Sequence, residues 1–362
     1  MKIPFNVLNR QFYKYQEEYE KKAIEVLRSG WYILGNEVSE FEKEFAKYIG
    51  SKYAIGVDNG LNALVLAFRA LEIGKEDEVL VQGNTYIASV MGISMNGATP
   101  VFIEPDQYYN MDMDKVEEKI NSKTKAILVT HLYGQASNMD KVVELCKKHD
   151  LYLIEDCAQS HGANFNGKRT GTFGIGCFSF YPSKNLGCFG DGGAITTNDE
   201  NLLKKLKTLR NYGSEKRYYN EVVGYNSRLD EIQAGLLRVK LSHIVELTAE
   251  REKNAKKYLE KIKNPLIKLP QLREGSTSVW HLFVVKTDMR DKLQEYLEKN
   301  EIGSVIHYPI PPHLSKAYEY LGYKNGDFPI TENYANTLLS LPFYNGMTDE
   351  EIEYVIKTIN AY

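Results

Sequence analysis

The sequence predicts an α/β fold built around a large, mainly parallel sheet and followed by a smaller C-terminal α+β domain. Two observations lead to this expectation. From about residue 53, short apolar runs alternate with longer stretches of helical periodicity, as is typical of βαβ units. The chain also has 362 residues, which is more than one hydrophobic core usually supports. We therefore expect a large domain over residues 1–245 and a smaller domain over residues 246–362.

Seven apolar runs are expected to form the large sheet, because each is short and bounded by Gly, Asn, Asp or Pro. They cover residues 53–57, 78–82, 99–104, 126–133, 151–157, 177–181 and 193–197. Between the strands we expect helices, for example over 61–73, where apolar residues on all sides indicate a buried helix. Residues 230–262 predict one long helix that bridges to the C-terminal domain, where strand character resumes at 280–287.

Composition and charge narrow the possible functions. The net charge of −3 gives no general attraction to nucleic acid. The N-terminal residues lack the pattern of a signal peptide, and no stretch approaches 18 uninterrupted apolar residues, so a soluble, cytoplasmic protein is expected. The four cysteines have no zinc-ligand spacing, so we expect reduced thiols and no metal.

The most informative stretches are IEDCAQSHGA (154–163) and CFSFYPSKNLGCFGDGGAI (177–195). They place Asp156 at a strand end and Lys184 on a glycine-rich loop. Active side chains gather where parallel strands end, so we expect the two residues to share one crevice. The pair suits pyridoxal 5′-phosphate, because this cofactor needs a lysine for its Schiff base and an acid that keeps its pyridine nitrogen protonated. Lys184 would also move the substrate proton.

Other residues are candidates for holding such a cofactor. The loop Asp58-Asn59-Gly60 enters a helix, and helix N-termini offer free N–H groups to a phosphate, to which Ser179 could add a hydroxyl. Tyr86 could stack on the ring, although a packing role is almost as reasonable. Asp156 could instead cap a helix, and Ser179 could be an ordinary buried hydroxyl.

Six segments resemble, in this order along the chain, the DegT/DnrJ/EryC1/StrS family of pyridoxal-phosphate-dependent nucleotide-sugar aminotransferases. They are DNGLNAL, NTYIAS, EDCAQSHGA, FSFYPSKNLG, GDGGAI and YNSRLDEIQA. The resemblance covers almost the whole chain. It implies a type I aminotransferase fold, a homodimer with two shared active sites, and L-glutamate as the usual amino donor.

The resemblance also assigns roles to individual residues. It implies that Lys184 carries the Schiff base, Asp156 contacts the pyridine nitrogen and Gln159 contacts the ring face. Many family members have threonine where Leu61 stands, so here the backbone amide of Leu61 would have to bind the phosphate. The implied phosphate contacts are Asn59, Gly60, Leu61, Ser179 and, lent by the neighbouring subunit, Asn226.

The substrate is indicated by a further similarity. The ending GSVIHYPIPPHL, together with Gln82–Tyr86, resembles the FdtB-like and QdtB-like subgroup, which acts at C3 of dTDP-3-keto-6-deoxyhexoses. This similarity implies that Tyr181, His307 and Tyr308 surround the hexose, with Arg217 arriving from the partner subunit. Amination at C4 of a 4-keto sugar, and either the gluco or the galacto configuration, remain open.

Three other functions would each require a different sequence feature. A dehydratase of the same family would have histidine in place of Lys184. An NAD-dependent epimerase would need G-x-G-x-x-G, but the corresponding turn reads GVDNGLNAL. A non-catalytic sensor would not need both Lys184 and Asp156. Because no metal-ligand spacing accompanies His131 and His161, we expect both to be structural histidines with satisfied hydrogen bonds.

Overall fold

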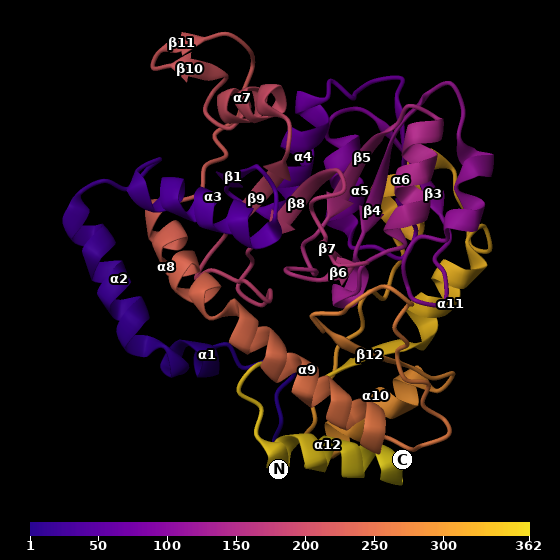
Figure 1. Cartoon of the computed structure of the whole chain (residues 1–362). Helices are drawn as coiled ribbons and strands as arrows, with labels where there is room; N and C mark the ends of the chain where they lie inside the picture. The colour runs from indigo at the N-terminus through magenta and orange to yellow at the C-terminus, as the bar shows by residue number, and fades with distance from the viewer.

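A seven-stranded sheet forms the centre of the computed structural model, which describes all residues from 1 to 362 (Figure 1). The strand order is β1-β9-β8-β5-β4-β2-β3. The neighbours from β8 to β3 pair in parallel, whereas β9 is antiparallel to both β8 and β1. The mixed, mainly parallel fold is therefore confirmed, and every expected strand is present: β1 (Tyr53–Val57), β2 (Glu78–Gln82), β3 (Thr99–Ile103), β4 (Thr124–Thr130), β5 (Tyr152–Asp156), β8 (Ile175–Ser179) and β9 (Gly193–Thr197).

Helices cover both faces of this sheet, because successive strand residues point to opposite sides. In β2, for example, Val79 and Val81 belong to one buried cluster and Leu80 to another. The first face packs against α4 (Gly60–Ala70), α5 (Ile87–Ser94) and α7 (Glu200–Leu209). The second packs against α3 (Asn36–Ile49), α6 (Met139–Lys148) and α8 (Glu231–Ser242).

A second hydrophobic core is built mainly from C-terminal residues between Ala255 and Ile359, in the part of the chain drawn below the sheet in Figure 1. Its strands β12 (Phe283–Lys286) and β13 (Leu338–Leu341) pair in antiparallel fashion. The N-terminal Ile3 is also buried in this core and bridges to Ile302. Helices α9 (Ile244–Lys261), α10 (Arg290–Lys299) and α12 (Asp349–Ala361) contribute to this core, whereas α11 (Pro329–Thr337) leads into β13. The boundary at residue 245 stays a prediction.

The expected single helix over 230–262 is wrong, because the chain forms two helices, α8 and α9, that meet at His243. His243 has φ −103° and ψ 3°, outside the helical region. Its ring stacks on Tyr15 with centroids 3.9 Å apart, and its Nε2 lies 3.0 Å from the Glu18 carboxylate. Contacts with a distant part of the chain thus accompany the break.

The remaining elements are short or peripheral. No helix combines the length and apolar character needed to cross a membrane. The proline-rich segment 302–313 is irregular apart from single bridges at Ile302 and Val305 and the 3₁₀ turn that begins at Pro312. These elements are α1 (Asn9–Lys14), α2 (Gln16–Ser29), β6 (Asn164–Phe165), β7 (Lys168–Arg169), β10 (Ser214–Lys216), β11 (Tyr219–Asn220), and the 3₁₀ turns Met113–Lys115, Glu117–Lys119, Leu132–Gly134, Pro312–Leu314 and Lys316–Leu321.

Candidate active site

Asp156 and Lys184 lie at the ends of two neighbouring parallel strands. Asp156 is the last residue of β5, and Lys184 follows β8 on the loop that leads to β9. Desolvation by burial lowers the pKa of Lys184 from 10.5 to about 8, while the nearby charge of Asp156 acts in the opposite direction. The structure therefore brings the two side chains together, and it leaves a substantial share of the lysine as a free amine near neutral pH.

The Asp156 carboxylate is buried, with 6% of the residue exposed. Its Oδ2 accepts a 2.7 Å hydrogen bond from Ser89 Oγ, and its Oδ1 accepts one of 3.1 Å from the Ala158 amide. No helix begins after β5, so the alternative role of Asp156 as a helix cap is not observed. The carboxylate is instead fixed at the sheet edge, beside the loop that carries Lys184.

Three histidines surround Lys184 and are held neutral. Burial is the main cause, and the positive charge of Lys184 adds to it, so that the pKa of His161 falls to about 3 and that of His307 to about 4. The pKa of His281 lies well below its usual value for the same reasons. His281 was not expected from the sequence, although the Trp-His pair just before β12 could have drawn attention to it.

His161 corrects an expectation. It is fully buried as expected of a structural histidine, but neither ring nitrogen has a hydrogen-bond partner. Its ring instead packs against Phe178 and Phe180, with centroids 5.6 and 5.8 Å away. The ring is therefore stabilised by aromatic packing rather than by hydrogen bonds.

A group of polar and aromatic side chains lies near Asp156. Gln159 is 4% exposed, so it is not a helix-surface residue. Its Oε1 accepts a 2.6 Å hydrogen bond from the Tyr133 amide, and its Nε2 donates one of 3.1 Å to Tyr308 Oη. The Tyr308 ring lies 5.0 Å from that of Tyr86, which is half exposed. Tyr133, which the sequence did not single out, donates a 2.5 Å hydrogen bond to the carbonyl of His307.

The N-terminus of α4 packs closely against β8 and β9. A Cβ atom added to Gly60 would lie 2.5 Å from Ser179 Cβ, and one added to Gly193 would lie 2.5 Å from the Asn59 backbone. The amides of Gly60 and Leu61 have no partner within the helix, because they belong to its first turn. This arrangement fits a phosphate group. The Asn59 side chain is used locally, since its Oδ1 caps α4 by accepting from the Asn62 amide at 2.8 Å.

Three of the expected site residues lie away from this crevice or face outward. Arg217 is in the turn between β10 and β11, on the hairpin that projects beyond α7 in Figure 1. Its guanidinium lies 4.9 Å from the ring of Tyr218. Asn226 is exposed on the loop before α8, and Tyr181 is 56% exposed. One subunit alone therefore does not bring Arg217 to Lys184.

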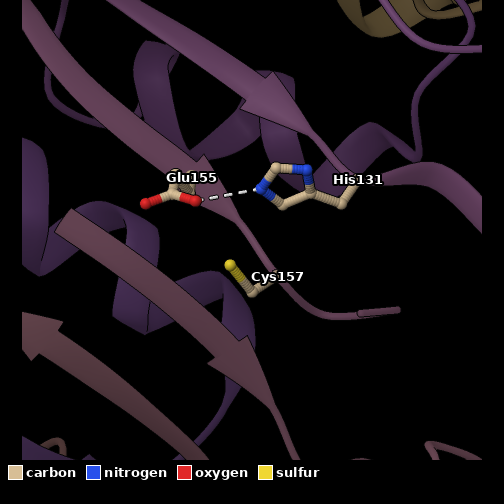
Figure 2. Close-up of side chains that lie close together, drawn as sticks. All are labelled: His131, Glu155 and Cys157. Carbon is tan, nitrogen blue, oxygen red and sulfur yellow. Dashed lines mark hydrogen bonds and ion pairs between the residues drawn. The ribbon is translucent and has the colours of Figure 1, made fainter. Parts of the chain in front are cut away.

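Figure 2 shows a second cluster, formed by His131, Glu155 and Cys157 on the ends of β4 and β5. The His131 Nδ1 accepts a 3.0 Å hydrogen bond from the Ser137 amide, so its Nε2 carries the proton and donates to Glu155 at 3.1 Å. Burial raises the pKa of the Cys157 thiol well above its usual value. Glu155 also accepts 2.8 Å hydrogen bonds from the amides of Gly171, Phe173 and Gly174.

The potential metal ligands of this cluster are therefore already in use. Both nitrogens of His131 and both oxygens of Glu155 make hydrogen bonds, and the neutral thiol of Cys157 is a poor ligand. Its role is to fix the turn that leads into β8. As the sequence predicts, His131 is a structural histidine with both ring nitrogens satisfied.

Comparisons with known proteins agree with this geometry. A family model described as the DegT/DnrJ/EryC1/StrS aminotransferase family matches residues 14–360. The dTDP-3-amino-3,6-dideoxy-alpha-D-galactopyranose transaminase of Aneurinibacillus thermoaerophilus is 52% identical over 362 residues, covering 99% of each chain.

Two solved structures extend the comparison. The S. venezuelae protein DesV, in complex with a ketimine intermediate, has a TM-score of 0.98 and 42% identity, and the match covers 99% of this chain and 98% of DesV. The Bacillus subtilis protein NtdA, with the bound cofactor PMP, has a TM-score of 0.91 and 29% identity, and the match covers 99% of this chain and 84% of NtdA.

Proposed function

The chain belongs to the DegT/DnrJ/EryC1/StrS aminotransferase family, and from that premise we propose that it moves an amino group from L-glutamate to C3 of a dTDP-linked 3-keto-6-deoxyhexose. The product is the 3-amino-3,6-dideoxy sugar. The observation that carries the aminotransferase chemistry is the proximity of Lys184, with its lowered pKa, to the buried Asp156. The choice of sugar rests on the 52% identity to the A. thermoaerophilus transaminase.

We propose pyridoxal 5′-phosphate as the cofactor. When bound, it supplies a carbonyl that takes up the amino group and a ring that draws electrons from the reacting carbon. Lys184 is suited to bind it covalently, because its lowered pKa provides the neutral amine that such a bond requires. Once released from that bond, the same Nζ would carry a proton between the substrate carbon and the cofactor.

Other residues of the crevice orient the cofactor. Asp156 pairs with the ring nitrogen, and the buried Gln159 limits one face of the ring. Tyr86, half exposed beside Tyr308, offers its ring for stacking. The phosphate would be held at the start of α4, where Gly60 and Leu61 offer amides and Ser179 a hydroxyl. The side-chain Nδ2 of Asn59, which the helix cap leaves free, is a further donor to the phosphate.

We further propose a homodimer in which each subunit completes the site of the other. Tyr181, His307 and Tyr308 surround the hexose from one subunit, while Arg217 and Asn226 come from its partner. Support comes from the exposure of large apolar side chains near these two residues and in the N-terminal region, which would be unusual for a monomer. Examples are Trp31 at 64%, Tyr218 at 82% and Val223 at 80% exposure.

The test is a direct assay of the reaction. The protein, loaded with pyridoxal phosphate, is incubated with L-glutamate and a dTDP-3-keto-6-deoxyhexose in the gluco or galacto configuration. We expect 2-oxoglutarate and a dTDP-amino sugar whose nitrogen is at C3 by NMR, and neither product with Lys184→Ala. Turnover of a dTDP-4-keto-6-deoxyhexose, with nitrogen at C4 of the product, and no turnover of the 3-keto sugars would support the 4-keto alternative. Binding of both ligands without turnover would support the sensor.

A further inference from the structure

Three buried hydroxyl groups connect Asp156 to the end of β4. Thr130 Oγ1 lies 3.0 Å from Thr85 Oγ1, Thr85 Oγ1 lies 2.7 Å from Ser89 Oγ, and Ser89 Oγ lies 2.7 Å from Asp156 Oδ2. None of these four residues is more than 6% exposed. The chain of hydroxyls is therefore continuous, shielded from water, and ends on the carboxylate that faces Lys184.

The direction of these hydrogen bonds follows from the number of protons available. An ionised carboxylate only accepts, so Ser89 donates its single hydroxyl proton to Asp156. Ser89 Oγ must then accept from Thr85, and Thr85 Oγ1 must accept from Thr130. All three O–H bonds thus point along the row toward Asp156, and hydrogen bonds aligned in this way strengthen one another.

Three parts of the fold hold this row of hydroxyl groups in place. Thr130 is the last residue of β4 and is in register with Asp156 on β5. Thr85 lies just before α5 and Ser89 lies in its first turn, and their hydroxyls meet each other beside the strand ends. Gln82 Oε1 accepts from the Thr130 amide at 3.3 Å, which anchors the far end.

We propose that this hydroxyl chain is a positioning device that keeps Asp156 ionised and correctly oriented, so that the ring nitrogen of the cofactor stays protonated. The proposal rests on the function proposed above. In a buried site, the proton shared by a pyridine nitrogen and a carboxylate can move to the carboxylate and leave both groups neutral. Donors aimed at the carboxylate oppose that transfer, because they stabilise its charged form.

The ionisable neighbours of Asp156 agree with this role. Lys184 lies beside it, and the pKa values of Cys157 and Cys177 are raised well above normal by burial, so both thiols are neutral. The carboxylate of Glu155, the residue before Asp156, is hydrogen-bonded to His131 and to the amides of the following turn. The donors to the Asp156 side chain are Ser89 and the Ala158 amide.

The experiment measures the ring nitrogen itself. Protein is loaded with pyridoxal phosphate labelled with ¹⁵N in the ring, and the ¹⁵N chemical shift reports whether that nitrogen is protonated. Ser89→Ala is expected to move the shift toward the unprotonated value and to lower kcat about tenfold with little change in KM, since a hydrogen bond to a charged group contributes on this order. Thr85→Val should have a smaller effect in the same direction, and Thr130→Val the smallest.

The matched control is Ser160→Ala. Ser160 is also fully buried, but its hydroxyl donates to Thr170 rather than to Asp156, so the ¹⁵N shift should stay that of the wild type. A wild-type shift in both Ser89→Ala and Thr85→Val would overturn the proposal, and the nearly isosteric Thr85→Val serves as the test if Ser89→Ala does not fold. Failure of the wild-type protein to bind the labelled cofactor would instead contradict the proposed function.

Discussion

The charge of Asp156 opposes, without cancelling, the desolvation that lowers the pKa of Lys184 to about 8. Because the pKa is lowered, the neutral amine of Lys184 is available at a pH well below that needed for an ordinary lysine. In the cofactor-free protein, we expect acetylation of Lys184 by an amine-specific reagent to be half-maximal near pH 8. Mass spectrometry of peptides across a pH series measures this.

Lys148 is the control within the same sample, because Glu117 raises the pKa of Lys148 above its usual value. Its labelling should require a higher pH than that of Lys184. Asp156→Asn removes the anion that raises the pKa of Lys184, so its midpoint should move below 8. An unchanged midpoint in this variant would show that the two groups do not interact.

The second prediction concerns phosphate binding at the start of α4. Leu61 is the second residue of that helix and has no hydroxyl to offer. Leu61→Thr should add a hydrogen bond to the phosphate and bind pyridoxal phosphate about tenfold more tightly than Leu61→Val, which has the same shape without the hydroxyl. Equilibrium dialysis of the two variants measures the difference. Equal affinities would mean that the phosphate lies elsewhere.

The third prediction tests whether subunits share their sites. Lys184→Ala and Asn226→Ala proteins should each be impaired alone. After they are mixed and allowed to exchange subunits, one site of each mixed dimer has both Lys184 and the partner subunit's Asn226, so activity should rise. The same exchange with Arg217→Ala tests the sugar contact. No rise in activity, with mixed dimers present by mass spectrometry, would place both residues in their own subunit's site.

The fourth prediction concerns the cluster drawn in Figure 2. Glu155→Gln leaves buried amides of the Gly171–Gly174 turn without a proper acceptor, and should lower the free energy of unfolding by about 3 kcal/mol. Urea denaturation checks this against Glu117→Gln, an exposed carboxylate whose substitution is expected to have a much smaller effect. Zinc should leave the wild-type curve unchanged, and stabilisation by zinc would contradict the structural role of the cluster.

Much of the fold could be predicted from the sequence, because each strand of the large sheet is a short apolar run bounded by turn residues. The break between α8 and α9 could not be predicted in this way. No glycine or proline marks it, and the contacts of His243 with Tyr15 and Glu18 involve residues more than 200 positions away. Helical periodicity carries no information about such contacts.

Some residues of the site could likewise be predicted from the sequence, and others could not. Asp156 and Lys184 could be found because strand ends of a parallel sheet share an edge. Ser89 could not be found, because its partner Asp156 is 67 residues away in the sequence. The local sequence around a serine does not indicate which distant group its hydroxyl will contact. Tyr133 and His281 were missed for the same reason, since their roles depend on His307 and Lys184 in three dimensions.

The most direct test of the account is to locate the lysine that binds the cofactor. The protein is loaded with pyridoxal phosphate, reduced with borohydride, digested and mapped by mass spectrometry. We expect the pyridoxyl group on Lys184. Lys240, also buried and with a pKa lowered to about 7, should be unmodified and provides an internal comparison. Modification of Lys240 or another lysine in place of Lys184, or none at all, would contradict the central claim.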